Sequence, residues 1–255
     1  MNKGTSQGNQ EEINFVKELN TNKDTNLWNI LGLENNSNLY AVRCTTNKES
    51  KISKSKVLPK TDVFIIKTSD TIVSTDFFID EDILKEQNIN FTYIPNSGIS
   101  IKEKDSKSFT YQKMTIETFF KIFKNYELGC AIEYYTGAND RNKNIILEKA
   151  WHTDRDKIIE VIKTLKSELN YDKNLKLSDD KEIKQTAISL TKFIINNNNK
   201  ISDFIFRGVG AFNDPFYINY LYKEGKLISN CYPSKYSITT GSGRSKKQYT
   251  VVIKP

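Results

Sequence analysis

Gly98-Ile-Ser-Ile-Lys-Glu-Lys104 is the stretch that decides the fold, together with Pro59-Lys-Thr-Asp62 and the apolar run Val63-Phe-Ile-Ile66 that follows it. Short runs rich in β-branched and aromatic residues are typical of strands. Asp62 stands where the first strand begins, and Lys102 lies on the later one. We expect the two strands to belong to one sheet, which brings the Asp62 carboxylate beside Lys102.

The Lys102 strand has two different faces. Side chains alternate along a strand, so Ser100, Lys102 and Lys104 share one face, and Glu103 lies on the opposite, mainly apolar face. Glu103 therefore cannot supply an acid next to Lys102. The alternative interpretation is a half-buried strand whose serine and lysine merely face solvent.

An Asp and a Lys in this arrangement suit phosphodiester hydrolysis. That reaction needs a divalent cation that neutralises phosphoryl oxygens and activates a water, and Asp provides the hard oxygen ligand that Mg²⁺ prefers. Lys provides a point charge that can hold the attacking water or stabilise developing negative charge. One carboxylate makes a poor metal site, so a second acid is required.

Glu12 is the candidate for the second acid. A helix is predicted from about residue 9 to residue 20, and Glu12 falls on its apolar stripe with Phe15, Val16 and Leu19. A charge facing the core needs a partner such as a metal or a lysine. The alternative is that Glu12 lies in the first helical turn, where it caps the helix or complements its dipole.

The remaining pattern predicts an α/β or α+β fold, with a central mixed sheet, flanking helices and C-terminal hairpins. Thr153 is the expected N-cap of a helix at 154–169. Other helices are predicted at 26–33, 115–124, 127–135 and 179–195, and other strands at 39–44, 71–78, 91–94, 216–222, 226–231, 236–240 and 248–253.

Composition favours a polyanionic partner. The 255 residues include 38 Lys and Arg against 31 Asp and Glu, a formal net charge of +7. Three widely spaced cysteines support neither a disulfide framework nor a zinc cluster, and a reducing cytosol is expected. No apolar stretch approaches the length of a membrane span, so no membrane partner is expected.

Two segments concentrate positive charge. Residues 45–60 contain five lysines and a single acid, Glu49. This segment is either a solvated loop or an arm that contacts phosphates. The glycine-rich loop at 239–247 includes Ser242, Arg244, Lys246 and Lys247, and is either a solvated hairpin tip or a DNA-contacting loop.

In its first 115 residues the chain resembles the type II restriction endonucleases of the PD-(D/E)xK nuclease superfamily. Gln7-Gly-Asn-Gln-Glu-Glu12 is similar to a Gly-x-x-x-Glu helix opening of several members, Pro59-Lys-Thr-Asp62 to the first acid motif, and Gly98-Ile-Ser-Ile-Lys102 to the lysine strand. The stretch from Glu103 to Lys113 resembles the basic segment that follows this strand in short-site enzymes of the MspI and HaeIII kind. The departure is Ser100, where the superfamily usually has Glu or Asp.

The resemblance implies a role for each residue of the site. Asp62 would ligate Mg²⁺, Glu12 would ligate it directly or through water, Lys102 would position the attacking water, and Ser100 would hydrogen-bond to the hydration shell of the metal. It also implies a cytoplasmic bacterial enzyme that cuts double-stranded DNA at a short specific sequence, within a restriction-modification system, with a homodimer on a palindromic site as one arrangement.

The expected domain is single and spans residues 1–255. Residues 1–125 would carry the catalytic elements, and residues 126–255 would carry helices and hairpins for DNA recognition. The expected DNA contacts are Lys104, Lys107, Tyr111, Gln112, Lys113, Ser242, Arg244, Lys246 and Lys247.

Two rival functions stay open at this point. One is a nucleic-acid-binding protein that has lost catalysis, which Ser100 would suit. The other is a cytosolic protein-interaction domain whose lysines are only compositional.

Overall fold

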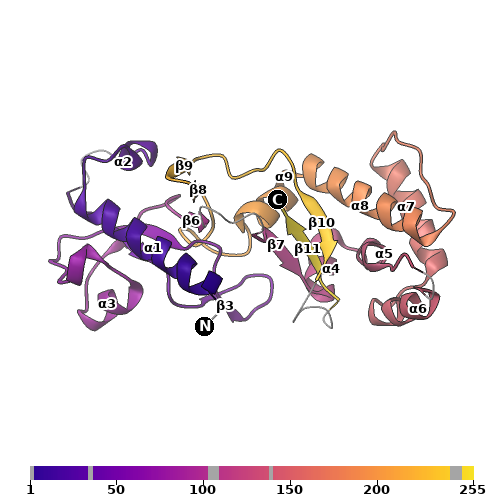
Figure 1. Ribbon diagram of the computed structural model, residues 1–255, viewed down its shortest axis with the longest axis horizontal. Coiled ribbons are helices and arrows are strands. Elements are labelled where there is room, and N and C mark those ends of the chain that lie inside the picture. Colours follow the sequence, from indigo (N-terminus) through magenta and orange to yellow (C-terminus); the bar gives the residue numbers. More distant parts are fainter. Residues whose placement is uncertain (1–2, 34–36, 103–108, 138–139, 242–248) are drawn as a thin grey trace. The chain divides into compact units, whose positions relative to one another are not determined.

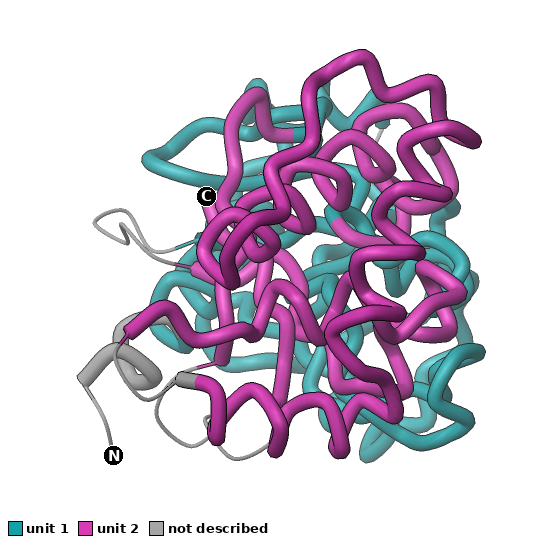
Figure 2. Tube along the Cα trace, turned by 90° about the vertical axis from the view of Figure 1, so that its right-hand side faces the viewer, with its two compact units in different colours: residues 1–107, 206–232 teal, residues 108–205, 233–255 magenta. Residues whose placement is uncertain are grey.

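The computed structural model describes residues 3–33, 37–102, 109–137, 140–241 and 249–255. The chain divides into two compact units, one formed by residues 1–107 and 206–232 and the other by residues 108–205 and 233–255, coloured separately in Figure 2. The prediction of one domain over residues 1–255 stays a prediction. The predicted hairpin at 216–231 belongs to the unit that holds Asp62 and Lys102.

The first unit is built on a mixed sheet, as predicted. Its strand order is β1-β4-β6-β8-β9, and β5 pairs with β4. Figure 1 labels β6, β8 and β9 of this sheet. The pairing of β6 with β8 is parallel, and the other pairings are antiparallel. The strands are β1 (Leu39–Arg43), β4 (Val63–Lys67), β5 (Thr92–Tyr93), β6 (Ile99–Lys102), β8 (Tyr220–Lys223) and β9 (Lys226–Ile228).

Helices cover both faces of this sheet. Helix α1 (Lys3–Thr21) lies across β1 and β6, and with α2 (Asn26–Ile30) it encloses a core that includes Phe15, Ile99 and Ile101 (Figure 1). Helix α3 (Glu81–Glu86) packs Leu84 on the opposite face, against Phe64. The predicted α+β class with a central mixed sheet between helices is confirmed.

Asn20 fixes α1 on the sheet. Its amide oxygen accepts a hydrogen bond from the Ala41 nitrogen at 2.8 Å, and its amide nitrogen donates to the Ala41 oxygen at 2.9 Å and the Phe77 oxygen at 3.1 Å. The side chain is buried, so these bonds satisfy polar groups that have no access to water. Asn20 therefore sets the position of Glu12 two turns earlier on the same helix.

A short antiparallel ribbon lies between β1 and β4 in the chain and belongs to the first unit. It consists of β2 (Lys48–Glu49), β3 (Lys56–Val57) and the residues that connect them, all within the basic 45–60 segment. The sequence pattern did not predict these strands.

The second unit combines a three-stranded antiparallel sheet with helices. Strands β10 (Ser237–Thr240) and β11 (Val251–Lys254) form the predicted C-terminal hairpin, and β7 (Gln112–Met114) pairs with β11. Helix α5 is buried along most of its length and contacts α7 and α8. The helices are α4 (Ile116–Phe123), α5 (Glu127–Glu133), α6 (Asp140–Ala150), α7 (Arg155–Glu168), α8 (Asp180–Asn197) and α9 (Asn199–Ser202), followed by the π-helix η2 (Asp203–Arg207).

Three expectations about local structure were wrong. The segment predicted as a strand at 71–78 is irregular and ends in the 3-10 turn η1 (Thr75–Phe77). The Gln87 side chain hydrogen-bonds to both the backbone nitrogen and the backbone oxygen of Val73, which a neighbouring strand would otherwise do. The N-cap of α7 is Asp154, which accepts from the Lys157 nitrogen at 2.9 Å, and Thr153 has no such role. Helix α1 begins at Lys3, well before residue 9.

Within the described residues, no helix combines the length and the apolar character needed to cross a membrane.

Glu133 on α5 gives the first testable prediction. Burial raises the pKa of its carboxyl to about 7, partly offset by the charge of Lys184, and its Oε1 has no hydrogen-bond partner among the described residues. A carboxyl whose pKa is raised on folding stabilises the protein below its ordinary pKa, and this contribution is lost as the pH rises through the folded value. Glu133→Gln should therefore resemble the wild type near pH 4.5 and be more stable above pH 7, by up to about 3 kcal/mol.

Urea unfolding between pH 4.5 and pH 8 measures this difference. Glu160→Gln, on the exposed surface of α7, is the matched control and should show no pH-dependent gain. Equal stability of Glu133→Gln and wild type at pH 8 would contradict the assignment.

Candidate active site

The site lies where the central sheet opens between β4 and β6. These strands form one residue pair, Val63 with Ile99, and side chains bridge the strands on either side of it. Beyond one end, Ser97 Oγ accepts from the Ile65 nitrogen at 3.1 Å. On the other side of this pair, the Asp62 side chain plays the same part and accepts from the Ile101 nitrogen. A polar side chain can enter a sheet here because the ladder is interrupted.

Asp62 replaces a carbonyl as the partner of a backbone N–H. Its Oδ2 accepts from the Ile101 nitrogen at 2.7 Å and from Ser100 Oγ at 3.0 Å. Burial raises the pKa of the Asp62 carboxyl, while the positive charge of Lys102 and these two hydrogen bonds act in the opposite direction. The carboxylate is thus held in one orientation by two donors.

Ser100 links Asp62 to Lys102. Its side chain is fully buried, and Lys102 Nζ donates to Ser100 Oγ at 2.6 Å. The alternative of a solvent-facing serine is therefore wrong. A hydroxyl can accept from an ammonium and donate to a carboxylate at the same time, so the three side chains form one chain of hydrogen bonds.

Glu12 reaches the same region from α1. Its Oε2 accepts from Arg43 Nε at 2.8 Å, and Arg43 also donates to Asn9 Oδ1 at 3.1 Å. Burial and the negative charge of Asp62 raise the pKa of the Glu12 carboxyl, while Arg43 and Lys102 lower it. Because α1 begins at Lys3, Glu12 lies in the third helical turn, and the capping alternative is wrong.

Two cations near the site were not identified from the sequence. Arg43 ends β1 and pairs in register with Val63, next to Asp62, so an arginine at the end of a predicted strand was the available signal. Lys60 precedes Asp62 by two residues. Burial and the charge of Lys102 lower the pKa of Lys60 to about 7, and its side chain lies against Gly208, where a Cβ would come within 3.1 Å of Lys60 Cδ.

Asp62 and Glu12 fit a magnesium ion in their chemistry. Both offer hard carboxylate oxygens, and Asp62 Oδ1 accepts no hydrogen bond from any described residue. The negative charge of Asp62 disfavours ionisation of Glu12, and a cation shared by the two would relieve this repulsion. No group of three or more His, Cys, Asp or Glu converges in the described part of the chain, so a metal here would rely on these two acids, water and substrate oxygens.

The other predicted contacts fall into two groups. Tyr111, Gln112 and Lys113 lie on or beside β7 in the second unit, where the Tyr111 nitrogen donates to the Ile253 oxygen at 2.8 Å and Lys113 is exposed. The six remaining residues lie outside the described residues; they are Lys104, Lys107, Ser242, Arg244, Lys246 and Lys247.

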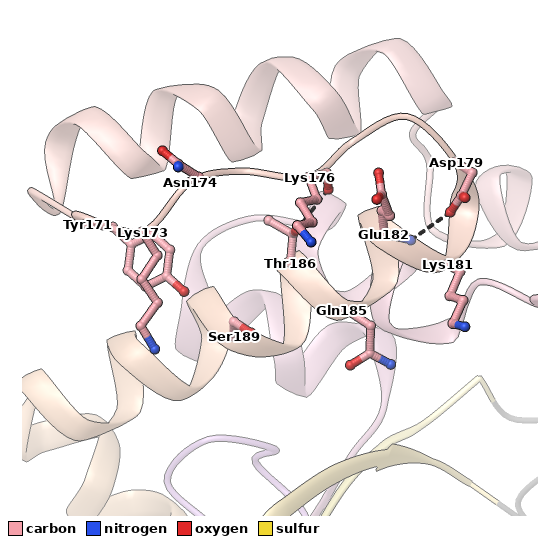
Figure 3. A pocket seen from close by; sticks show the side chains of 10 residues that line it. All are labelled: Tyr171, Lys173, Asn174, Lys176, Asp179, Lys181, Glu182, Gln185, Thr186 and Ser189. Atoms are coloured by element: carbon pink, nitrogen blue, oxygen red, sulfur yellow. Dashed lines mark hydrogen bonds between the residues drawn. The ribbon is translucent and has the colours of Figure 1, made fainter.

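The second unit also contains a pocket of about 490 Å³, between α8 and the segment that precedes it (Figure 3). Its side chains include Lys173, Lys176 and Lys181 beside the acids Asp179 and Glu182. Asp179 is engaged as the N-cap of α8, accepting from the Glu182 nitrogen at 2.8 Å. None of the predicted site residues that the structure describes lines this pocket.

No protein-family model matches the chain, and no curated protein matches it. Among solved structures it is similar to the restriction endonuclease MspI in complex with its cognate DNA, with 11% identity and a TM-score of 0.47. This similarity covers 99% of the present chain and 90% of the other.

Substitutions of Asp62 separate its structural role from its charge. Asp62→Ala leaves the Ile101 N–H without its acceptor and should lower the free energy of unfolding by about 1–3 kcal/mol. Asp62→Asn keeps an oxygen acceptor and removes a buried charge, so its free energy of unfolding at pH 8 should stay within about 1 kcal/mol of wild type.

Urea unfolding of both variants measures this, with Asp172→Ala as an exposed control that should be neutral. Equal losses in Asp62→Asn and Asp62→Ala would show that the carboxylate charge, and not its hydrogen bonding, holds the sheet.

Proposed function

We propose that the protein is a magnesium-dependent endonuclease of restriction type that hydrolyses phosphodiester bonds at a short specific sequence in double-stranded DNA. The observation that carries this proposal is the hydrogen-bonded chain Asp62–Ser100–Lys102 in the opening between β4 and β6, with Glu12 beside it. It unites an acid and a lysine that the sequence motifs had placed in the order typical of PD-(D/E)xK nucleases.

Asp62 and Glu12 would hold Mg²⁺, which when bound lowers the pKa of water and neutralises phosphoryl oxygens. Asp62 is suited to this role because two donors fix its Oδ2 and leave Oδ1 available. Arg43 orients Glu12 through its 2.8 Å bond. These contacts preorganise the acids before substrate binds.

Lys102 would position the attacking water and stabilise charge on the phosphoryl group. Ser100 receives one N–H of the Lys102 ammonium, which directs the side chain toward Asp62. An ammonium carries three N–H donors, and the proposal requires one of those not bonded to Ser100 to reach water or a phosphate oxygen when substrate is bound.

The proposal extends to partners and location. The substrate is duplex DNA, in keeping with a net charge of +7, and a homodimer would match a palindromic site. Lys104, Lys107, Tyr111, Gln112, Lys113 and the 242–247 loop are the proposed contacts outside the site. The enzyme would act in a bacterial cytoplasm as part of a restriction-modification system.

Lys102→Ala provides the direct test. The variant should lose at least 100-fold in cleavage rate, because the water loses its positioning group, while it retains duplex DNA to a similar extent. Supercoiled plasmid is incubated with Mg²⁺ or with EDTA, and nicked and linear forms are quantified. Lys67→Ala removes an exposed lysine from the other end of β4 and should cut like wild type. Undiminished cleavage by Lys102→Ala would sink the assignment of this site.

A catalytically inactive DNA-binding protein is the second candidate, and the neutral Ser100 favours it. Such a protein would retain duplex DNA in a salt-dependent way and leave plasmid intact with Mg²⁺ or Mn²⁺. The slope of log affinity against log salt should be about −5 if roughly six phosphates are neutralised. A flat salt response would contradict both DNA-dependent functions and favour a protein-interaction domain.

A further inference from the structure

We infer that the β2–β3 ribbon, residues 48–57, is a phosphate-contacting arm that binds duplex DNA beside the bond to be cut. The inference rests on the proposed nuclease function and adds a surface to it. The ribbon carries Lys51, Lys54 and Lys56, none of which the motif resemblance included among the DNA contacts.

The ribbon begins and ends at the candidate active site. It leaves the sheet after Arg43, which binds Glu12, and returns through Lys60 to Asp62. The Cys44 nitrogen donates to the backbone oxygen of Asp62 at 2.8 Å, so the residues before and after the ribbon are hydrogen-bonded to each other. Lys56 precedes Asp62 by six residues, a span of at most about 20 Å, which is the length of about six base pairs. A duplex bound at Asp62 would therefore lie within reach of the ribbon.

The ribbon displays its lysines in an ordered backbone. Ser50 is buried, and its Oγ accepts from the nitrogens of Ile52 and Ser53 at 3.3 and 3.2 Å. The Lys54 nitrogen donates to the Ser50 oxygen at 2.9 Å, and the Lys51 nitrogen donates to the Ala211 oxygen at 2.8 Å. Because the tip is already held in place, little conformational entropy is lost when it binds a ligand.

One lysine of the ribbon is paired within the fold, and three are exposed on its surface. Lys48 is paired with Glu81 and lies over the ring of Phe216, so its charge is used within the fold. Lys51, Lys54 and Lys56 are exposed and form no ion pair with any described residue. Exposed cations on a short, ordered β-ribbon, with hydroxyls at Ser53 and Ser55 between them, suit the evenly spaced phosphates of a duplex.

The test compares two triple variants with equal charge. Lys51→Ala/Lys54→Ala/Lys56→Ala removes the three exposed positive charges of the ribbon. Lys67→Ala/Lys85→Ala/Lys226→Ala removes three exposed lysines of the same unit at other places and is the control. Binding to a linear mixed-sequence duplex is measured in EDTA over a range of salt. The arm variant should bind at least about tenfold more weakly near 0.1 M salt, with a salt slope flatter by about 2–3, and the control should bind like wild type.

Two further measurements make the result specific. Lys51→Arg/Lys54→Arg/Lys56→Arg should restore affinity and slope, which a folding defect in the alanine variant would not explain. Polyglutamate should compete poorly with duplex DNA for wild type. Equal weakening in the arm variant and the control, no weakening in either, or equal competition by polyglutamate would each overturn the inference.

Failure of the arm and failure of the nuclease can be told apart. Wild-type protein that cuts plasmid while the arm variant binds DNA normally refutes only the arm. Wild-type protein that neither binds nor cuts DNA refutes the proposed function, and the arm with it.

Discussion

The hydrogen bond from the Ile101 nitrogen to Asp62 Oδ2 is the constraint on which the rest of the site depends. The two central strands β4 and β6 pair at a single position, and a buried N–H just beyond it needs an acceptor. A carboxylate supplies it. The Asp62 side chain therefore stabilises the sheet where the ladder between β4 and β6 is interrupted, and the same bond brings an acid to the strand that carries Lys102. Folding and the proposed chemistry share one contact.

The surrounding charges balance this buried acid. Arg43 and Lys102 favour the charged forms of Asp62 and Glu12, and burial acts against them. Burial and the charge of Lys102 both lower the pKa of Lys60. Such a cluster favours ligands that bring further compensating charge, and a divalent cation with a phosphate diester brings both signs together. The charges of the site are therefore compatible with the proposed ligands, a divalent cation and a phosphodiester.

Much of this arrangement was predictable from the sequence, because strand alternation is a local rule. The apolar run at Val63 and the alternation around Ile101 placed Asp62 and Lys102 in one sheet, and the structure brings them together through Ser100. The side-chain partners were harder to predict. That Arg43 binds Glu12 depends on the crossing of α1 over β1, which Asn20 fixes through contacts distant in sequence. The irregular segment near Val73 was missed for a similar reason, since a distant glutamine supplies the hydrogen bonds that a strand would have made.

Ser100 places a neutral, hydrogen-bonding side chain next to the buried Asp62. A carboxylate at this fully buried position would stand about as close to Asp62 as the hydroxyl does, at 3.0 Å, and two like charges there would disfavour the folded state unless a cation bridged them. Serine avoids that repulsion, and its hydroxyl still connects Lys102 to Asp62. The Ser100 hydroxyl thus accepts from Lys102 Nζ and donates to Asp62 Oδ2. In the proposed nuclease, Glu12 on α1 would therefore act as the second acid beside Asp62, in place of an acid on β6.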